Sequence, residues 1–282
     1  MIPTLIWAFS FGLIGNALKG LDPLQIADTR LLLALIAFLH FIKFGNNNGK
    51  EKWQLILLGA LQYGVMYTCY LSAFSYLPSH LVALFSVLTP LYIVIINDLR
   101  QRSFTPWYIV ATILSVFGAA IIKMGNIDSN EIWLGFGLMQ IANMAFAFGQ
   151  VYYRDWKKSR THISDKSIFG FLYLGAAIFT TIATLLISQQ PPIPLDATPT
   201  QWFVLVYMGI IASGLCFFLW NKGGTQTSVG VLATFNNAVV PLAMFASLFI
   251  FGEAKGGSSE ELIRLAIGSM LIVTALLIAK LK

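Results

Sequence analysis

The chain has 282 residues, of which 57% are hydrophobic and only 11% are Asp, Glu, Lys or Arg. Soluble domains carry about 25% charged residues, so this composition excludes an ordinary soluble protein and indicates a chain that crosses the lipid bilayer several times. The net charge of +6 does not indicate a nucleic-acid partner, because the basic residues stand in short gaps between apolar runs.

Ten apolar runs follow one another, each close to the ~20 residues that a helix needs to span the bilayer. The first begins almost at the N-terminus, so we interpret it as a retained helix and not a signal peptide. The runs predict an all-α membrane protein with ten transmembrane helices. They are Ile2–Leu18, Leu24–Ile42, Trp53–Phe74, Ser79–Asn97, Trp107–Met124, Ile132–Val151, Ser167–Ile187, Trp202–Asn221, Val229–Phe251 and Leu262–Leu281.

The distribution of basic residues orients these helices. With the N-terminus in the cytoplasm, thirteen of the 18 Lys and Arg residues fall in cytoplasmic gaps and four in outer gaps. Lys and Arg concentrate on the cytoplasmic side of membrane proteins. We therefore expect a multi-pass protein of the cytoplasmic membrane with both termini in the cytoplasm.

The first two runs carry side chains that a plain membrane anchor does not need. Trp7 and Phe11 lie one helical turn apart, where they either pack between helices or contact a substrate. Asp28 and Arg30 are the only formal charges clearly inside an apolar run, and a spacing of two places them on different helix faces. Arg30 either snorkels and orders helix ends or captures a substrate carboxylate at the outer gate.

Two further runs each carry similar side chains on one helix face, aromatic in one run and amide in the other. Tyr63, Tyr67 and Tyr70 form an aromatic stripe at helical spacing, which suits either packing or a cavity wall. Gln140 and Asn143 share a face of a later run, where their amides either bond neighbouring helices or hold a polar substrate.

The run around 229–251 combines amides with a proline at mid-membrane. Asn236 and Asn237 place amide groups in hydrocarbon, where an unpaired polar group is costly. Pro241 removes a backbone donor and bends a helix, and Pro90 in the fourth run stands in a similar setting, LTPL against VVPL. We predict a substrate site beside Asn236 and Asn237, with Pro90 and Pro241 as hinges.

The two halves of the chain share short sequence motifs that occur in the same order. AFSFG in the first helix matches AFAFG in the sixth, and the two prolines match as well. Five helices per half give the second half the opposite orientation in the membrane, as in the inverted repeats of secondary transporters. We predict a first repeat over residues 1–126 and a second over 127–282, joined by the short outer loop around 125–131 within one membrane domain.

With these motifs in place, the chain resembles the drug/metabolite transporter superfamily, specifically its EamA-type ten-helix carriers. The resemblance rests on IWAFSFGLIG in the first helix, on Arg30 followed by LLLALIAF, on LTPL, and on VVPLAMFASLFIFGE with Pro241, Gly252 and Glu253. One departure is Arg102, which stands where many members have Glu in the first repeat. The resemblance implies a carrier, often an exporter of amino acids or similar metabolites. It also implies a central cavity lined mainly by helices 1, 3, 4, 6, 8 and 9.

These features predict a secondary transporter for a small organic solute, an amino acid or a similar metabolite, moved outward by two halves that rock about the bent helices. An alternative solute is another amphipathic metabolite or a drug. Asp28 is the one clear acid within the spans, so we expect facilitated exchange or weak coupling through Asp28. The chain works as a monomer or a homodimer.

A membrane-embedded enzyme that modifies lipids is the other function class. That chemistry needs clustered acids, a nucleophile beside a base, or metal ligands. Cys69 and Cys216 lie in apolar runs, where thiols act as small hydrophobic groups, and the three histidines have no ligand spacing. The sequence therefore predicts no enzyme activity, no metal site and no cofactor.

Overall fold

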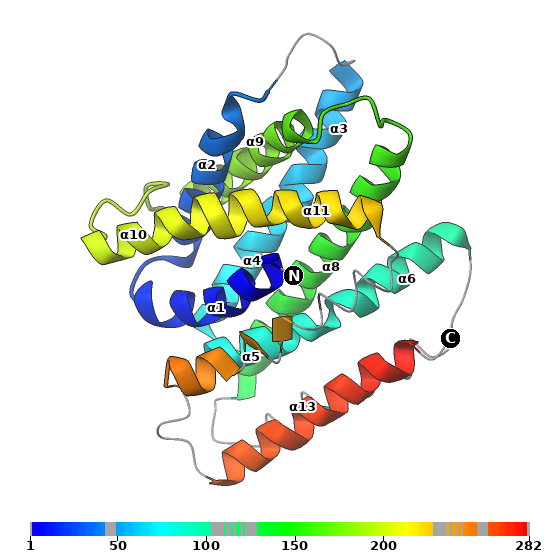
Figure 1. Ribbon diagram of the computed structural model, residues 1–282. Coiled ribbons are helices and arrows are strands. Elements are labelled where there is room, and N and C mark those ends of the chain that lie inside the picture. The colour runs from blue at the N-terminus through cyan, green and yellow to red at the C-terminus, as the bar shows by residue number, and fades with distance from the viewer. Residues whose placement is uncertain are drawn as a thin grey trace.

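The computed structural model describes residues 2–42, 49–102, 129–227 and 259–280, with residues 110, 114, 117, 118, 121, 236, 239, 240, 242, 243 and 245–252. Every described element is a helix (Figure 1). The α-helices are α1 (Ile2–Ala17), α2 (Pro23–Leu39), α3 (Gly49–Gly59), α4 (Met66–Ser72), α5 (Ser79–Phe85), α6 (Thr89–Gln101), α8 (Ser129–Lys158), α9 (Asp165–Ala183), α10 (Pro199–Tyr207), α11 (Cys216–Gln226) and α13 (Ser259–Lys280).

Short 3₁₀ and π segments join several of these helices into longer ones. The π segments are η1 (Ala60–Val65), η4 (Thr184–Ser188), η5 (Met208–Leu215) and η6 (Ala246–Ile250), and the 3₁₀ segments are η2 (Ala73–Ser75) and η3 (Ser86–Leu88). Such segments inside a helix often mark functional positions, because they redirect the side chains that follow.

Five continuous helical segments of the described chain are long and apolar enough to cross a membrane. The described residues confirm the all-α class, and the five segments have the length and composition of membrane spans, whereas the count of ten spans stays a prediction. The expected span Trp107–Met124 and much of Val229–Phe251 lie outside the described residues. The five segments are Gly49–Ser75, Ser79–Arg100, Glu131–Lys158, Asp165–Ser188 and Pro199–Gln226.

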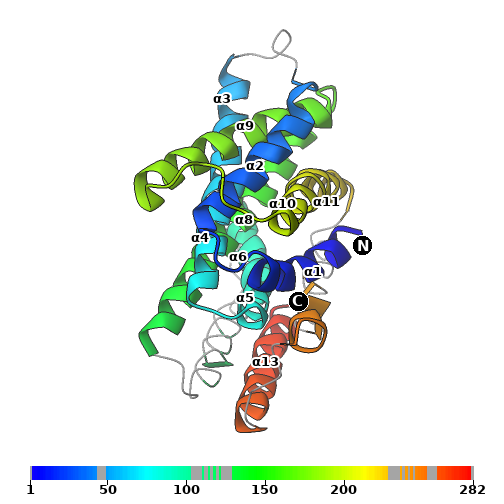
Figure 2. The ribbon, with the colours of Figure 1, turned by 90° about the vertical axis from the view of Figure 1, so that its left-hand side faces the viewer.

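Most of the described helices pack around two hydrophobic cores, and a small third cluster joins α6 to α8. The larger core joins α2, α3, α4, α9 and α11 with the middle and end of α8. The smaller core joins α1, α5 and α6 with the start of α8 and with Val239, Val240 and Ala243. Figures 1 and 2 show this division: α2, α3 and α9 form the upper part, and α5, α6 and α13 form the lower part. Trp7 and Tyr70 pack against both cores, so an aromatic layer joins them.

Each core mixes helices from both predicted repeats. The larger one packs α2 and α3 against α9, and the smaller one combines α5 with Val239, Val240 and Ala243. The two cores are also joined to each other, because the continuous helix α8 contributes Ile132 and Met139 to the smaller core and Ala142 and Phe146 to the larger one. The predicted rocking of one repeat against the other stays a prediction.

Two helices of the larger core approach until their backbones touch. A Cβ built on Gly59 of α3 would lie 1.9 Å from the carbonyl oxygen of Leu172 on α9, and one on Gly175 would lie 1.9 Å from the carbonyl oxygen of Ile56. Small residues allow such close packing of membrane helices, where van der Waals contact replaces the hydrophobic effect as the driving force. The two glycines therefore fix the α3–α9 distance.

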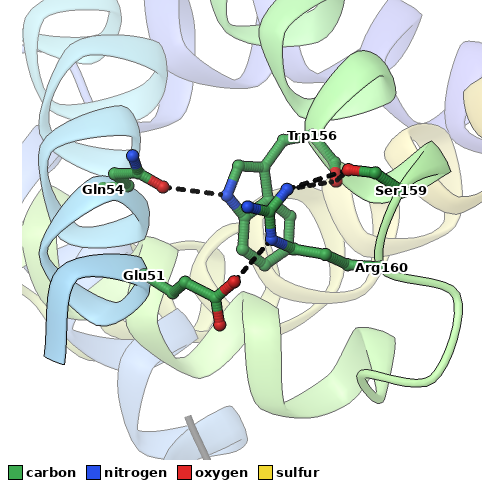
Figure 3. Close-up of polar contacts among 5 residues, drawn as sticks. All are labelled: Glu51, Gln54, Trp156, Ser159 and Arg160. Atoms are coloured by element: carbon green, nitrogen blue, oxygen red, sulfur yellow. Dashed lines mark hydrogen bonds and ion pairs between the residues drawn. The ribbon is translucent and has the colours of Figure 1, made fainter. Parts of the chain in front are cut away.

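A polar cluster ties the start of α3 to the end of α8, on the side predicted to be cytoplasmic (Figure 3). The Arg160 guanidinium pairs with the Glu51 carboxylate at 2.7 Å, and it lies over the Trp156 ring. The Trp156 indole N–H donates to the Gln54 side-chain oxygen at 3.2 Å. The pair is partly shielded from water, so it is worth about 1 kcal/mol to the packing of these helix ends.

We expect Gly175→Leu to destabilise the protein strongly, because the added side chain would collide with the α3 backbone. Overpacking of this kind costs about 3 kcal/mol, which corresponds to a Tm lower by roughly 6–12 °C. Gly137→Leu is the matched control, since a Cβ there meets nothing within 4 Å. Thermal unfolding of the purified variants in detergent measures both, and equal Tm values would contradict the close contact.

Candidate functional site

A cavity of about 110 Å³ lies where the two cores meet. Seven labelled elements (α1, α2, α4, η3, α6, α8 and α11) contribute to its wall together with residues 236 and 239, so the residues come from both predicted repeats. Its lining combines one buried cation, several amides and hydroxyls, and aromatic rings. These residues are Trp7, Ser10, Phe11, Arg30, Met66, Tyr67, Tyr70, Ser86, Thr89, Met139, Ala142, Asn143, Phe146, Phe217, Asn236 and Val239.

Arg30 supplies the charge of this cavity. The residue is only 2% exposed, and its guanidinium donates from Nη2 to the Tyr67 hydroxyl at 2.8 Å and from Nε to Ser213 Oγ at 3.2 Å. The Tyr67 and Ser213 hydroxyls also bond each other at 2.8 Å. Nη1 has no hydrogen-bond partner in the described structure. The guanidinium therefore turns into the cavity and does not snorkel toward the membrane surface.

No carboxylate of the described chain pairs with Arg30. Asp28, two residues earlier, faces α9, where Thr180 and Thr181 each donate to its Oδ1 at 2.9 Å. The predicted separation of the two charges onto different helix faces is therefore confirmed. Asp28 does not line the cavity, and Arg30 meets the cavity with neutral partners only.

The break between α5 and α6 opens a second polar region of the cavity. The Thr89 N–H bonds the Ser86 carbonyl across the 3₁₀ turn η3, which leaves the Phe85 carbonyl without its helical partner. Asn143 of α8 donates to that carbonyl at 2.8 Å and accepts from the Thr89 hydroxyl at 3.0 Å. Pro90 follows in the first turn of α6, and because proline has no N–H it cannot form the helical hydrogen bond to the Ser86 carbonyl across the break. The side-chain amide of Asn143 thus replaces the hydrogen bond that the Phe85 carbonyl loses at the break.

Asn236 adds another amide to the same cavity. Its side chain lines the wall, and its Nδ2 has no partner among the described residues. An unpaired buried amide is costly, which favours a ligand or a water opposite it. The neighbouring predictions Asn237 and Pro241 lie outside the described residues.

Aromatic rings form the remaining wall. Trp7 packs against Phe146 and Phe217 and anchors its indole N–H on the Ala212 carbonyl at 2.8 Å. Phe11 meets Tyr70 edge to face, with ring centroids 5.7 Å apart. The structure therefore brings the predicted Trp7, Phe11 and Tyr70 together with Arg30.

Two predicted site residues are absent from the wall. Tyr63 is fully buried in the larger core, where its hydroxyl accepts a hydrogen bond from Asn221 at 2.9 Å. Gln140 is not among the wall residues, and its Oε1 accepts a hydrogen bond from the Asn143 side chain at 3.3 Å. Both residues therefore support their neighbours and do not face the cavity.

Sequence reasoning missed several wall residues, because their types are ordinary in a membrane helix. Ser86 and Thr89 reach the cavity through the 3₁₀ break, and the nearby Pro90 was the available signal. Ser213 reaches Arg30 from the π segment η5, for which GIIASG gives only a run of small residues. Met66, Met139, Ala142, Phe146, Phe217 and Val239 carried no signal.

The described wall of the site is made mostly of neutral side chains. Within the described residues, no three His, Cys, Asp or Glu side chains gather to hold a metal ion. Arg30 is the one formally charged group among the described wall residues. The arrangement can hold a solute by one charge, several amides and hydroxyls, and aromatic surface, which is the chemistry of a binding pocket.

Comparison with known proteins agrees with this chemistry. The model of the EamA-like transporter family matches residues 1–124 and 129–279. A probable biotin transporter of Pseudomonas aeruginosa is 38% identical over 280 residues, which are 99% of this chain and 95% of that protein. A biotin transporter of Escherichia coli (strain K12) is 36% identical over 255 residues, which are 90% of this chain and 84% of that protein.

More distant proteins share the architecture. Protein PecM of Dickeya dadantii is 25% identical over 280 residues, which are 98% of this chain and 89% of that protein. One crystal structure with 18% identity superposes with a TM-score of 0.66 and covers 99% of this chain and 94% of its own, so it shares the fold. The family match and the two transporter relatives together confirm the predicted superfamily. The chain belongs to the EamA-like transporter family and is a multi-pass membrane transporter of small molecules.

Proposed function

We propose that this chain is a carrier for a small carboxylate-bearing solute of the biotin type. The observation that supports it most directly is Arg30, a buried guanidinium that lines the cavity with one N–H unpartnered. A guanidinium stays charged at any physiological pH and pairs well with a carboxylate. Biotin ends in such a carboxylate, and two relatives of this chain are named biotin transporters.

The rest of the wall suits the remainder of biotin. Its cyclic urea has two N–H donors and one carbonyl acceptor, which Asn143, Asn236 and the Thr89 hydroxyl complement. Its alkyl chain and thioether are apolar and fit beside Trp7 and Phe217. The cavity thus offers a cationic region, an amide region and aromatic surface to one solute.

This proposal departs from the predicted amino-acid substrate. An amino acid carries an ammonium group as well as a carboxylate, and an ammonium is bound best by an acid. The wall residues that the structure describes include no Asp or Glu. A solute with a carboxylate and a neutral body therefore fits this wall better than a zwitterion.

For the transport step, we propose that α5 and α6 move against α2, α3, α9 and α11 about the cavity, while α8, which belongs to both cores, joins the two groups of helices. The larger core holds α2, α3, α9 and α11, and the smaller one holds α5 and α6. The aromatic contacts of Trp7 and Tyr70 join them, and the α5–α6 break absorbs the motion. Because no acid lines the described wall, we propose movement along the solute gradient, outward export being one direction of it.

The proposed contact is tested by measuring the binding of biotin and of biotin amide to both the wild-type protein and the Arg30→Gln variant. Biotin amide lacks the carboxylate, so wild-type protein should bind it about 10–100-fold more weakly than biotin, as expected for a lost charge-assisted pair. In Arg30→Gln the two ligands should bind alike, because the cation is gone. Competition against radiolabelled biotin in membrane vesicles measures both. An undiminished preference for biotin in the variant would rule out Arg30 as the carboxylate partner.

Pro90→Ala tests the hinge. The variant regains one backbone hydrogen bond across the break, worth about 1 kcal/mol, so we expect biotin turnover to fall about fivefold while the Kd changes little. Pro199→Ala is the control, because Pro199 opens α10, where no helix is interrupted. Transport and equilibrium binding are measured on the same preparation, and normal turnover in Pro90→Ala would exclude the hinge.

A further inference from the structure

A second cavity, of about 620 Å³, lies at the predicted outer ends of α1, α2 and α4 and at the start of α5. We call it the outer vestibule, and its wall is formed by residues of the stretches 14–26 and 71–79. Binding pockets for small molecules usually have volumes of about 300–1,000 Å³, whereas one water occupies about 30 Å³. The outer vestibule is therefore large enough for a solute of the size of biotin.

The outer vestibule lies one helical turn beyond the Arg30 cavity on three helical segments. On each of them, one residue lines the cavity, and the residue four positions nearer the predicted outer face lines the vestibule. Four residues make about one turn, or about 6 Å along the helix axis. The pairs, with the cavity residue first, are Phe11 and Gly15 on α1, Arg30 and Ile26 on α2, and Tyr70 and Phe74 on α4 and η2. The two spaces are therefore consecutive along the same helices.

Aromatic rings stand at the boundary between the two spaces. The Tyr70 ring, which lines the cavity, meets the Phe74 ring of the vestibule edge to face, with centroids 5.4 Å apart. Phe11 of the cavity also packs edge to face on Tyr70, at 5.7 Å. The boundary is thus about one layer of side chains thick.

Lys19 supplies the one formal charge among the wall residues of the vestibule. It is exposed, and no carboxylate of the described chain pairs with it. The neighbouring acid Asp22 is not a wall residue, and its Oδ1 accepts hydrogen bonds from the backbone N–H groups of Leu24 and Gln25, at 2.9 and 3.0 Å. The vestibule therefore presents an unpaired cation, as the Arg30 cavity does, and this charge favours an anionic solute over a cationic one.

A buried hydroxyl adds a neutral hydrogen-bonding group to the vestibule. Ser79 is only 1% exposed, and its Oγ lacks a hydrogen-bond partner in the described structure. An unpaired buried hydroxyl is costly, which favours a polar group of a ligand or a water opposite it. Leu21 and Tyr76 are among the wall residues that supply apolar surface. The vestibule thus combines a cation, a hydroxyl and apolar surface, the kinds of group that also line the Arg30 cavity.

We propose that the outer vestibule is a second binding site for the carboxylate-bearing solute, in which Lys19 pairs with the carboxylate outside the Arg30 cavity. The proposal rests on the proposed function, because it concerns the same solute. Lys19 is open to water, so its ion pair is weaker than that of the buried Arg30, and salt screens it. The vestibule therefore collects the solute at low affinity and raises its concentration beside the Arg30 cavity.

Protection of a cysteine in the vestibule from a thiol reagent tests the site. Ser75 is an exposed wall residue, so Ser75→Cys places a reactive thiol there, in a protein that also carries Cys69→Ala and Cys216→Ala. N-ethylmaleimide is uncharged, so the charge of Lys19 does not alter its approach. Its rate of reaction with the purified protein in detergent is measured at increasing concentrations of biotin. Thr200→Cys, which is exposed at the predicted outer face but outside the vestibule, is the matched control.

We expect biotin to suppress most of the labelling of Ser75→Cys and to leave that of Thr200→Cys unchanged. Lys19→Gln should raise the half-protecting biotin concentration about threefold, the effect of one exposed ion pair, whereas Lys19→Arg should keep the original value. Added salt should raise that concentration in the protein with Lys19 and not in Lys19→Gln. Biotin amide should protect both proteins equally, because it has no carboxylate. Arg30→Gln should leave the protection by biotin in place, since the vestibule lies outside the Arg30 cavity.

Three results would overturn the second site and leave the proposed function standing. They are labelling of Ser75→Cys that biotin does not slow, a half-protecting concentration that is the same with and without Lys19, and protection that disappears in Arg30→Gln. The proposed function depends on a different measurement, the binding preference for biotin over biotin amide. If Arg30→Gln keeps that preference undiminished, the proposed function fails, whatever the labelling of the vestibule shows.

Discussion

The constraint on which the site depends is the burial of a permanent charge. Placing a guanidinium in a membrane interior is costly unless its donors are bonded, and Arg30 is nearly inaccessible to solvent. Tyr67 of α4 and Ser213 of η5 satisfy two of its nitrogens. This requirement holds α2, α4 and η5 together. Because both partners are neutral, the positive charge remains available to a ligand.

The element that carries Ser213, η5, is a π-helical segment. The hydroxyl of Tyr173, on α9, lies within hydrogen-bond distance of the Ser213 and Gly214 carbonyls of η5, at 2.9 and 2.7 Å, so the irregular backbone is still hydrogen-bonded. The break at η3 follows the same rule, since Asn143 satisfies the Phe85 carbonyl. Irregular backbone at membrane depth is tolerated where protein groups bond it or where it lines a cavity. Both irregularities lie beside the cavity or its charge.

The sequence predicted the helical class, the boundaries of the described spans to within several residues, and much of the cavity wall. Composition and run length suffice for the first two, and Arg30, Asn143 and Asn236 were visible as polar residues in apolar runs. Helical periodicity also grouped Tyr63 with Tyr67, yet only Tyr67 reaches the cavity. The π segment η1 covers residues 60–65, so it shifts the helical register between these two tyrosines. No pattern of residue types reveals such a shift.

The division into two cores also lay beyond the sequence. Internal similarity predicted two oppositely oriented repeats within one membrane domain, whereas contacts between helices depend on where small residues allow close approach. Gly59 and Gly175 join a helix of the first half to one of the second. Side-chain volume at such contacts thus sets how these helices pack, and the sequence similarity of the two halves does not reveal it.

Under the proposed function, the uncompensated charge also determines which form of the carrier reorients easily. An empty site leaves Arg30 unpaired by any described acid while the helices move, whereas a bound carboxylate neutralises it. We therefore expect the loaded carrier to reorient faster than the empty one, so that exchange of biotin for biotin exceeds net flux. Biotin enclosed in vesicles should stimulate entry of labelled biotin several-fold. Equal rates with and without enclosed biotin would mean that another group neutralises Arg30 in the empty state.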